Sequence, residues 1–288
     1  MTMHTRRIGD TQVSAIGLGG MPMSIEGRPD EQRSIATIHA ALDAGVTLID
    51  TADAYHLTAY DVGHNESLVA RARATYPGDT SDVLVATKGG HLRPGDGSWT
   101  VNDSPEYLKR ACDESLKGLG VDAIGLYQFH RPDPTVPYAE SVGAIRDLLD
   151  AGKIRRAGVS NAKREQILLA NEILDGRLSS VQNQLSPAFR SSEPELQLCT
   201  DLGIAFLPWS PLGGISHAGQ LGSRFAIFAD IARERGISPQ RVCLAWLLAK
   251  SPVVIPIPGS TRPETIRDSA AAADLQLSAQ ELAQLESA

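Results

Sequence analysis

Short apolar runs alternate with longer amphipathic segments along most of the chain. Within the longer segments, apolar residues recur three and four positions apart, as Ile35, Ile38 and Leu42 do, which indicates helices with one buried face. Strands that alternate with helices predict a parallel sheet, and eight such units predict a (β/α)8 TIM barrel. The eight runs expected as strands are residues 15–19, 47–50, 83–88, 123–130, 156–160, 180–183, 204–208 and 253–257.

Signals for the ends of helices agree with this interpretation. Ser104 and Ser238 each precede a proline, which places a capping hydroxyl just before the first helical residue. Ser278 and Glu281 form a capping-box pattern, so a last helix is expected from Ser278 to Leu285. Glycines that can end a helix in the left-handed conformation follow three helical patterns: Gly45, Gly152 and Gly203.

Three segments stand outside the alternation. The chain around Gly9 and Asp10 is expected to form an N-terminal β-hairpin. Residues 89–97 and 213–222 are rich in glycine, and we interpret them as long loops after the third and seventh strands, on the face that shapes a substrate pocket. No boundary interrupts the pattern, so residues 1–288 are expected to form one barrel domain.

A doubly wound sheet is the alternative fold. Its dinucleotide fingerprint, G-x-G-x-x-G, would have to lie at residues 17–22, where the sequence reads Gly-Leu-Gly-Gly-Met-Pro. Proline takes the place of the last glycine, so the barrel is favoured.

Composition and charge narrow the class of partner. The chain of 288 residues is 42% hydrophobic and 21% charged, as in an ordinary soluble globular protein. Its net charge of −7 and the lack of a block of Lys or Arg disfavour nucleic acid. A small-molecule partner and a monomer or weak homo-oligomer are expected.

The cysteines and the first residues bear on the compartment. Cys112, Cys199 and Cys243 are far apart, without a C-x-x-C pair, which is typical of core thiols in a reducing compartment. Residues 1–7 lack the apolar region of a signal peptide, and no apolar run nears the ~20 residues needed to span a membrane. We expect a cytoplasmic protein with no membrane partner.

Four ionisable side chains follow strand-like runs. Asp50, Lys88 and His130 each come at the end of such a run, and Tyr55 follows Asp50 by five residues. The carboxyl ends of barrel strands are where enzymes of this fold collect their catalytic groups. An acid, a phenol, an ammonium and an imidazole in one place could move a proton.

By their order and spacing, these residues and several other motifs resemble the aldo-keto reductase superfamily, and the resemblance covers nearly the whole chain. The motifs are Asp50-Thr51-Ala52-x-x-Tyr55, Thr87-Lys88, Leu126 to Asp133, Gly158-Val159-Ser160-Asn161, Gln182, Trp209-Ser210-Pro211-Leu212-Gly213 and Ile257-Pro258-Gly259-Ser260. The resemblance implies an enzyme that reduces aldehydes or ketones to alcohols with hydride from NADPH, because no side chain can supply hydride.

The resemblance also implies a role for each catalytic residue. Tyr55 would donate the proton, Lys88 would favour the phenolate, and Asp50 would keep the lysine charged and oriented. His130 would orient the carbonyl oxygen or help to relay the proton. Tyr60 lies five residues after Tyr55 and is the competing phenol in the same loop.

The cofactor site is likewise implied by the resemblance. Ser160, Asn161 and Gln182 would bind the nicotinamide carboxamide, Trp209 would stack on the ring, and Arg262 would grip a 2′-phosphate, which favours NADPH over NADH. The full set expected to contact NADP(H) is Gly20, Met21, Asp50, Ser160, Asn161, Gln182, Trp209, Ser210, Pro211, Leu212, Gly213, Ser260, Arg262 and Asp268.

The sequence departs from the best-known branch of that superfamily in two places. Gly259, Thr265 and Ser269 stand where lysine, arginine and asparagine are often found near the adenosine. An extended loop, residues 56–62, separates Tyr55 from the next helix start. The spacing of His56, Asp61 and His64 matches no fixed metal-ligand pattern, so no metal site is expected. Because branches of that superfamily that reduce bulky steroids often have a longer terminal loop, the resemblance and the short C-terminal tail favour small or flexible carbonyl substrates.

Two other functions compete with the reductase. A regulatory subunit that binds NADPH with little turnover is the main alternative, although no additional interaction domain supports it. A metal-dependent hydrolase would need a His-x-His pair at the end of an early strand, and the sequence has none there.

Overall fold

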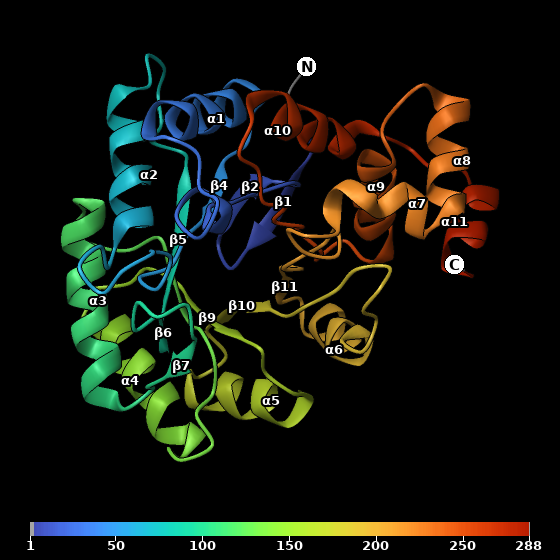
Figure 1. Cartoon of the computed structure of the whole chain (residues 1–288). Coiled ribbons are helices and arrows are strands. Elements are labelled where there is room, and N and C mark those ends of the chain that lie inside the picture. Colours follow the sequence, from blue (N-terminus) through green and yellow to red (C-terminus); the bar gives the residue numbers. More distant parts are fainter. Residues whose placement is uncertain (1–2, 288) are drawn as a thin grey trace.

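Seven parallel strands form a curled sheet at the centre of the computed structural model, which describes residues 3–287 (Figure 1). The strands lie side by side in the order β11, β10, β9, β8, β5, β4, β3. In chain order they are β3 Leu18–Gly19, β4 Leu48–Asp50, β5 Leu84–Gly89, β8 Leu126–Phe129, β9 Ala157–Ser160, β10 Leu178–Gln182 and β11 Ala205–Phe206. The sheet and its helices form the predicted (β/α)8 barrel.

The predicted eighth strand, residues 253–257, closes the barrel without a regular ladder. On one side the carbonyl of Val253 accepts a hydrogen bond from the backbone N–H of Phe206 in β11 (2.8 Å). On the other side the carbonyls of Pro256 and Pro258 accept from the backbone N–H groups of Gly17, just before β3, and of Gly19 in β3 (2.9 Å each). Proline has no N–H to donate, so this segment can pair only in part.

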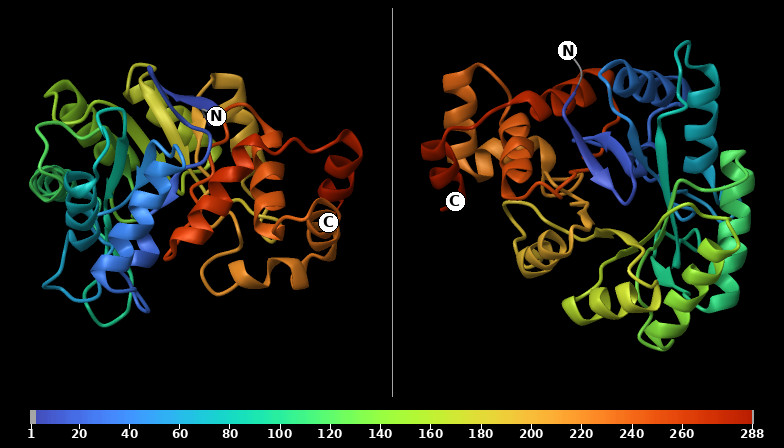
Figure 2. Two further views of the ribbon diagram at one scale, coloured as in Figure 1. Left: turned by 90° about the horizontal axis from the view of Figure 1, so that it is seen from above. Right: turned by 180° about the vertical axis from the view of Figure 1, so that it is seen from behind.

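Helices surround the sheet, as Figure 2 shows from two further sides. The helices are α1 Glu31–Asp43, α2 His64–Thr75, α3 Pro105–Leu119, α4 Tyr138–Asp150, α5 Arg164–Ile173, α6 Glu193–Leu202, α7 Leu221–Arg224, α8 Ala226–Arg235, α9 Pro239–Lys250, α10 Pro263–Ala270 and α11 Ala279–Glu286. Short 3₁₀ turns occur at Met21–Met23, Ala218–Gln220 and Ala271–Asp274.

The predicted capping signals act as expected. The hydroxyl of Ser104 accepts from the N–H of Tyr107 (3.3 Å) and that of Ser238 from the N–H of Arg241 (3.0 Å). Ser278 caps α11 in a capping box with Glu281. The three predicted terminating glycines all have positive φ: Gly45 (84°), Gly152 (72°) and Gly203 (68°).

The expected N-terminal hairpin consists of β1 Thr5–Ile8 and β2 Thr11–Ser14, joined through Gly9 at φ 57°. Its apolar side chains, Ile8 and Val13, join an inner core with Leu48, Leu84 and Leu126 from the barrel strands. Because Leu48, Leu84 and Leu126 are the first residues of their strands, the hairpin covers the amino end of the barrel and leaves the carboxyl end open.

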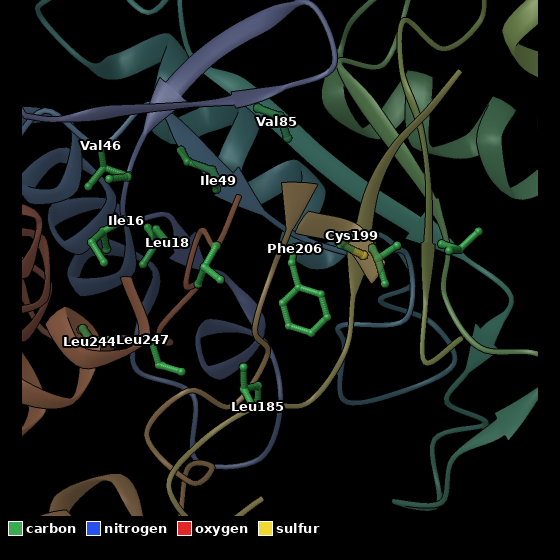
Figure 3. Packing of buried hydrophobic residues seen from close by; sticks show 14 of the residues in the cluster. Ile16, Leu18, Val46, Ile49, Val85, Leu185, Cys199, Phe206, Leu244 and Leu247 are labelled. Carbon is green, nitrogen blue, oxygen red and sulfur yellow. The ribbon is translucent and has the colours of Figure 1, made fainter. Parts of the chain in front are cut away.

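A second core lies between the sheet and the helices. Figure 3 shows part of it, in which Phe206 of β11, Ile49 of β4 and Leu244 of α9 are among the labelled side chains. The three cysteines lie in helices, buried and without disulfide bonds: Cys112, Cys199 and Cys243. They therefore occupy core positions, as the sequence predicted.

Two segments that we expected to be plain loops contain regular structure. Gly89 is the last residue of β5, and His91–Leu92 (β6) then pairs antiparallel with Thr100–Val101 (β7), so residues 91–97 belong to a hairpin. Residues 213–222 include the turn Ala218–Gln220 and the start of α7. Both segments lie beside the open end of the barrel, where they line the cleft described next.

Candidate active site

The four side chains expected to be catalytic lie together at the carboxyl ends of β4, β5 and β8. The Nζ of Lys88 donates to Oδ1 of Asp50 (2.5 Å), to the carbonyl of Thr51 (2.8 Å) and to the phenolic oxygen of Tyr55 (3.0 Å). The rings of Tyr55 and His130 meet edge to face, with centroids 5.9 Å apart. The predicted spatial convergence is therefore present.

Burial and charge act differently on the pKa values of Tyr55 and Lys88, the two partners of the 3.0 Å hydrogen bond. Burial raises the pKa of Tyr55, and Lys88 opposes this rise without cancelling it. Burial by itself would lower the pKa of Lys88, but Asp50 and the phenolic oxygen of Tyr55 outweigh it, so this pKa is raised. The phenol is thus protonated and the amine charged at neutral pH.

His130 is an uncharged imidazole in this setting. Burial, followed by the positive charge of Lys88, holds its pKa well below the usual value. Its Nδ1 is buried and has no hydrogen-bond partner among the described residues. His130 lines the cleft, where a neutral ring can hydrogen-bond to a ligand without adding charge.

Asp50 is held by more than the lysine. Its Oδ2 accepts from Nε2 of Gln182 (2.8 Å) and from Nε2 of Gln128 (3.3 Å). Sequence reasoning missed Gln128, although its position inside the strand that leads to His130 was the available signal. The two amides fix the carboxylate, and the carboxylate in turn fixes Lys88.

Sequence reasoning also missed two further buried acids behind the site. Asp53 and Glu66 are buried, and burial raises the pKa of both carboxyl groups, that of Asp53 most strongly and with a further contribution from Glu66. The hydroxyl of Tyr107 donates to Oδ2 of Asp53 (3.1 Å), and that of Thr87 donates to Oε1 of Glu66 (2.5 Å). Their closeness to Lys88 makes them part of its electrostatic surroundings.

A long cleft of about 1280 Å3 extends from these residues across the open end of the barrel. It is lined at one end by Tyr55 and His130 and at the other by residues of α10. Of the predicted set, the cleft is lined by Met21, Asp50, Tyr55, His130, Ser160, Asn161, Gln182, Trp209, Ser210, Pro211, Leu212, Ser260, Arg262 and Asp268. Lys88, Gly20 and Gly213 do not line it, and Lys88 lies behind Tyr55.

Gly20 has a packing role instead. A Cβ at this position would approach Oδ1 of Asn65 to 2.3 Å, and Nδ2 of Asn65 donates to the carbonyl of Gly20 (2.9 Å). The glycine thus lets α2 approach the turn that carries Met21. Contact between Gly20 and a cofactor stays a prediction.

The middle of the cleft offers polar groups suited to an amide ligand. Nδ2 of Asn161 donates to the carbonyl of His130 (3.0 Å) and to the hydroxyl of Ser160 (3.0 Å), which ties this pair to the catalytic end. Nε1 of Trp209 is buried and has no partner among the described residues. An unpartnered buried donor in a cleft is a position where a ligand can bind favourably.

Beyond Trp209 the backbone is shaped for close approach to a ligand. Ser210 has φ 50°, an uncommon value for a residue with a side chain, and Gly213 (88°) and Gly214 (92°) continue the left-handed turn. Such turns direct several backbone N–H groups toward one side, an arrangement that suits phosphate. The expected dinucleotide therefore fits the form and the donor groups of the cleft.

At the far end the structure explains one departure from the usual pattern. A Cβ at Gly259 would approach Cγ of Pro22 to 2.7 Å, so a lysine here would require this contact to open. Arg262 is half exposed, and its Nε lies 3.5 Å from Glu264. It therefore remains accessible to a phosphate ligand.

Asp268 lines the cleft but already has strong partners. Its Oδ1 accepts from Nη2 (2.6 Å) and Nε (3.0 Å) of Arg241, and its Oδ2 accepts from the hydroxyl of Ser238. The carboxylate therefore also ties the start of α9 to α10. Contact between Asp268 and the cofactor stays a prediction.

The extended loop at residues 56–62 is held by contacts on both sides. Nδ1 of His56 bonds to the carbonyl of Thr58 (2.7 Å), and Asp61 pairs with Arg28 (3.2 Å). Tyr60, the competing phenol, is fully exposed. No cluster of three or more potential metal ligands occurs among residues 3–287.

Arg93 connects three segments around the mouth of the cleft, and sequence reasoning missed it. Its side chain is almost fully buried; it donates to the carbonyl of His56 (2.6 Å), pairs with Glu26 and lies 4.8 Å from the ring of Trp99. Trp99 stacks on His91 (4.6 Å between centroids). An arginine in a loop gives no sequence signal of such contacts.

No helix of the described part of the chain is both long enough and apolar enough to cross a membrane.

Comparison with known proteins gives a consistent result. The chain is 34% identical over 269 residues to 6-dehydroglucose reductase of Novosphingobium aromaticivorans, covering 90% of this chain and 86% of the relative. Its fold is similar to an aldo-keto reductase from Klebsiella pneumoniae in complex with NADPH (TM-score 0.80, 32% identity, 100% and 95% coverage). It is also similar to a glycerol dehydrogenase from Gluconobacter oxydans (TM-score 0.83, 27% identity, 100% and 95% coverage).

A family model supports the same assignment over most of the sequence. The model described as "Aldo/keto reductase family" matches residues 15–288, which include every residue of the candidate site. With the barrel and the relatives described above, this match establishes that the chain belongs to the aldo/keto reductase family.

Proposed function

We propose that this protein is an NADPH-dependent oxidoreductase that reduces aldehydes or ketones to alcohols, with Tyr55 as the proton donor. One observation carries the proposal: the phenol of Tyr55 lines the cleft, while its oxygen accepts a 3.0 Å hydrogen bond from the buried Nζ of Lys88. Membership of the aldo/keto reductase family and the reductase and oxidoreductase names of its relatives support this activity.

The chain supplies the proton chemistry. A bound nicotinamide would supply hydride to the carbonyl carbon, and the electron pair of the C=O bond would move to oxygen. That oxygen takes the proton of Tyr55, and the resulting phenolate is stabilised by the charged Lys88 at hydrogen-bond distance. Water can return a proton to Tyr55 after the product leaves.

The neutral His130 would position the carbonyl oxygen. Its pKa, lowered first by burial and then by Lys88, keeps the ring uncharged, so it donates or accepts a hydrogen bond without competing with Tyr55 as an acid. Asn161 holds the carbonyl of His130 and thereby the orientation of this strand end.

The cleft would hold the cofactor in the following way. Ser160, Asn161 and Gln182 would contact the carboxamide, and Trp209 would lie against the nicotinamide ring. The turn from Ser210 to Gly214 would receive the pyrophosphate. Further residues in the proposed cofactor set are Gly20, Met21, Asp50, Pro211, Leu212, Gly213, Ser260, Arg262 and Asp268.

NADPH is proposed over NADH because of Arg262. The guanidinium lies at the α10 end of the cleft and can bind a 2′-phosphate through two N–H groups. A solved relative from Klebsiella pneumoniae is described in complex with NADPH, which agrees with this choice.

The decisive experiment follows the absorbance of NADPH during incubation with a panel of aliphatic, aromatic and sugar carbonyl compounds. Wild-type protein should consume NADPH, and Tyr55→Phe should lower kcat by about 10² to 10⁴ because the general acid is lost. Tyr60→Phe is the matched control and should leave turnover unchanged, since this phenol is fully exposed. Tight NADPH binding without turnover of any compound would contradict the reductase and favour a regulatory subunit.

A further inference from the structure

The catalytic end of the cleft contains an arginine whose charge the proposed mechanism does not use. Arg131 follows His130 directly and lines the same cleft. Its Nε is buried and has no hydrogen-bond partner among residues 3–287. A buried, unpaired polar group of a cation costs free energy that a ligand of opposite charge can offset.

Other arginines around the mouth differ in this respect. Arg93 pairs with Glu26, and Arg28 pairs with Asp61. Among the described residues that line the cleft, the other arginine is Arg262, which has Glu264 at 3.5 Å and lies at the opposite end. Arg131 also lines the cleft, but no acid of the described chain forms an ion pair with it.

The imidazole rings of His91 and His130 line the cleft together with Arg131. The positive charge of Arg131 is among the causes that lower the pKa of both histidines. Burial, and then Arg131, lowers the pKa of His91 to about 4. His91 packs edge to face on His130 (4.9 Å between centroids) and stacks on Trp99, so an aromatic wall extends outward from the reacting centre.

We propose that the substrates of this site are carbonyl compounds that carry a carboxylate, and that Arg131 pairs with that carboxylate while Tyr55 and His130 receive the carbonyl oxygen. The inference rests on the proposed reductase function. A carboxylate fits better than a phosphate, because one planar guanidinium matches two carboxylate oxygens and one negative charge. The neutral imidazoles beside it offer no second cation for a phosphate.

The position of Arg131 next to His130 also limits the size of the substrate. Arg131 and His130 are consecutive, so their Cα atoms lie about 3.8 Å apart, and both residues line the cleft. A short or flat spacer between the carbonyl and the carboxylate would span the two contacts. An aromatic spacer would in addition lie against His91 and Trp99.

The test compares an acid with its uncharged ester under the same conditions. For 4-formylbenzoate and its methyl ester, wild-type enzyme with NADPH should show a higher kcat/KM for the acid. Arg131→Gln should lower the acid-to-ester ratio by about ten- to one-hundred-fold, the usual effect of losing a hydrogen bond to a charged group, while turnover of the ester remains. Arg131→Lys should restore part of the ratio.

Arg146→Gln is the matched control for general electrostatic attraction. It removes the same charge from an exposed position on α4, outside the cleft, and should leave the ratio unchanged. An equal effect of both variants would show that net charge rather than Arg131 selects the acid, and would overturn the proposal. A phosphate arm, glyceraldehyde 3-phosphate against glyceraldehyde, overturns the choice of carboxylate if only the phosphate is favoured.

A binding measurement separates this inference from the proposed function. Calorimetry with benzoate, and with benzamide as the neutral control, requires no turnover; benzoate should bind to wild type in preference to benzamide, and this preference should disappear in Arg131→Gln. If the ester is reduced as well as the acid and benzoate shows no preference, the carboxylate site is wrong and the reductase stands. If nothing is reduced but benzoate binds through Arg131, the reductase fails and the anion site stands.

Discussion

At Tyr55, burial and charge act in opposite directions on the pKa of the phenol. The sequence predicted that Lys88 would favour the phenolate, whereas in the folded chain burial is the larger effect and the pKa is raised. For reduction this is an advantage, since the proton donor stays protonated until the carbonyl oxygen gains charge. Lys88 then acts mainly on the transition state, where the phenolate forms.

The pH dependence of reduction follows from these directions. Tyr55 must be protonated, its ordinary pKa of about 10 is raised further, and His130 is neutral, so the rate should stay level from about pH 7 to about pH 9 and fall only above about pH 10. Steady-state kcat for a fixed aldehyde across this range checks the prediction. A fall centred near neutral pH would mean that another group, or a lowered pKa of Tyr55, controls the reaction.

The Lys88 and Asp50 pair should show strong energetic coupling. Lys88→Met leaves a buried carboxylate without its cation and should cost about 3 to 5 kcal/mol of unfolding free energy. Lys88→Met with Asp50→Asn should cost less than the sum of the single variants, because both charges are gone. Urea unfolding of all four proteins gives the coupling energy, and simple additivity would show that the ion pair contributes nothing specific.

Asp53 should impose a pH dependence on stability. Its folded-state pKa is raised, first by burial and then by Glu66, so its contribution is fully present below the unfolded pKa of about 4 and is lost as pH rises through the folded value. Asp53→Asn should therefore gain stability over wild type as pH increases from about 4 to about 8. Thermal unfolding across that range tests this, and a difference that is independent of pH would contradict it.

At the scale of elements, the contacts of Arg93 hold the hairpin β6 to β7 against the loop at residues 56–62. Arg93→Gln should raise KM for the carbonyl substrate more than it lowers kcat, because it loosens the cleft mouth while Lys88 and Tyr55 stay in place. Glu26→Gln is the milder comparison, since Glu26 is 60% exposed and exposed ion pairs contribute only about 0 to 1 kcal/mol. Faster hydrogen exchange of residues 56–62 in Arg93→Gln alone would support the role of Arg93 in holding this loop. Equal effects of Arg93→Gln and Glu26→Gln would contradict that role.

Regular elements were predictable where local chemistry decides them. The capping serines and terminating glycines act through their own backbone neighbours. The helix start at Ser238 and the helix end at Gly203 could therefore be predicted from sequence alone. The hairpin at His91 was not predicted, because its glycine-rich surroundings show no strand alternation. The last barrel segment was found as an apolar run, but its prolines limit it to partial pairing.

At the scale of the whole molecule, the barrel brings together residues that are far apart in the chain. Parallel strands end at one face, which is why Asp50, Lys88 and His130 could be expected to meet. The resemblance to a family was needed to add the far residues of the cofactor cleft. The surroundings of Arg131 were not predictable, because they depend on how the hairpin packs across the barrel mouth.

NADPH binding should stabilise the whole barrel, since the cleft is lined by segments from the first strand to α10. At a concentration of about 100 times Kd the gain is about 2.7 kcal/mol, which should raise Tm by several degrees. NADH at equal concentration should raise it less, and Arg262→Gln should narrow the difference. Equal shifts with both cofactors in wild type would contradict a 2′-phosphate site at Arg262.

In the proposed reaction the hydride comes from NADPH and the proton from Tyr55, and one isotope measurement, made on wild type and Tyr55→Phe, tests both. Wild-type protein is incubated with an aldehyde and NADPH that carries deuterium at the transferable position, and mass spectrometry follows the alcohol. We expect one deuterium on the carbinol carbon, formed about 10² to 10⁴ times more slowly by Tyr55→Phe at unchanged NADPH affinity. An alcohol without deuterium, or an equal rate for Tyr55→Phe, would contradict the account.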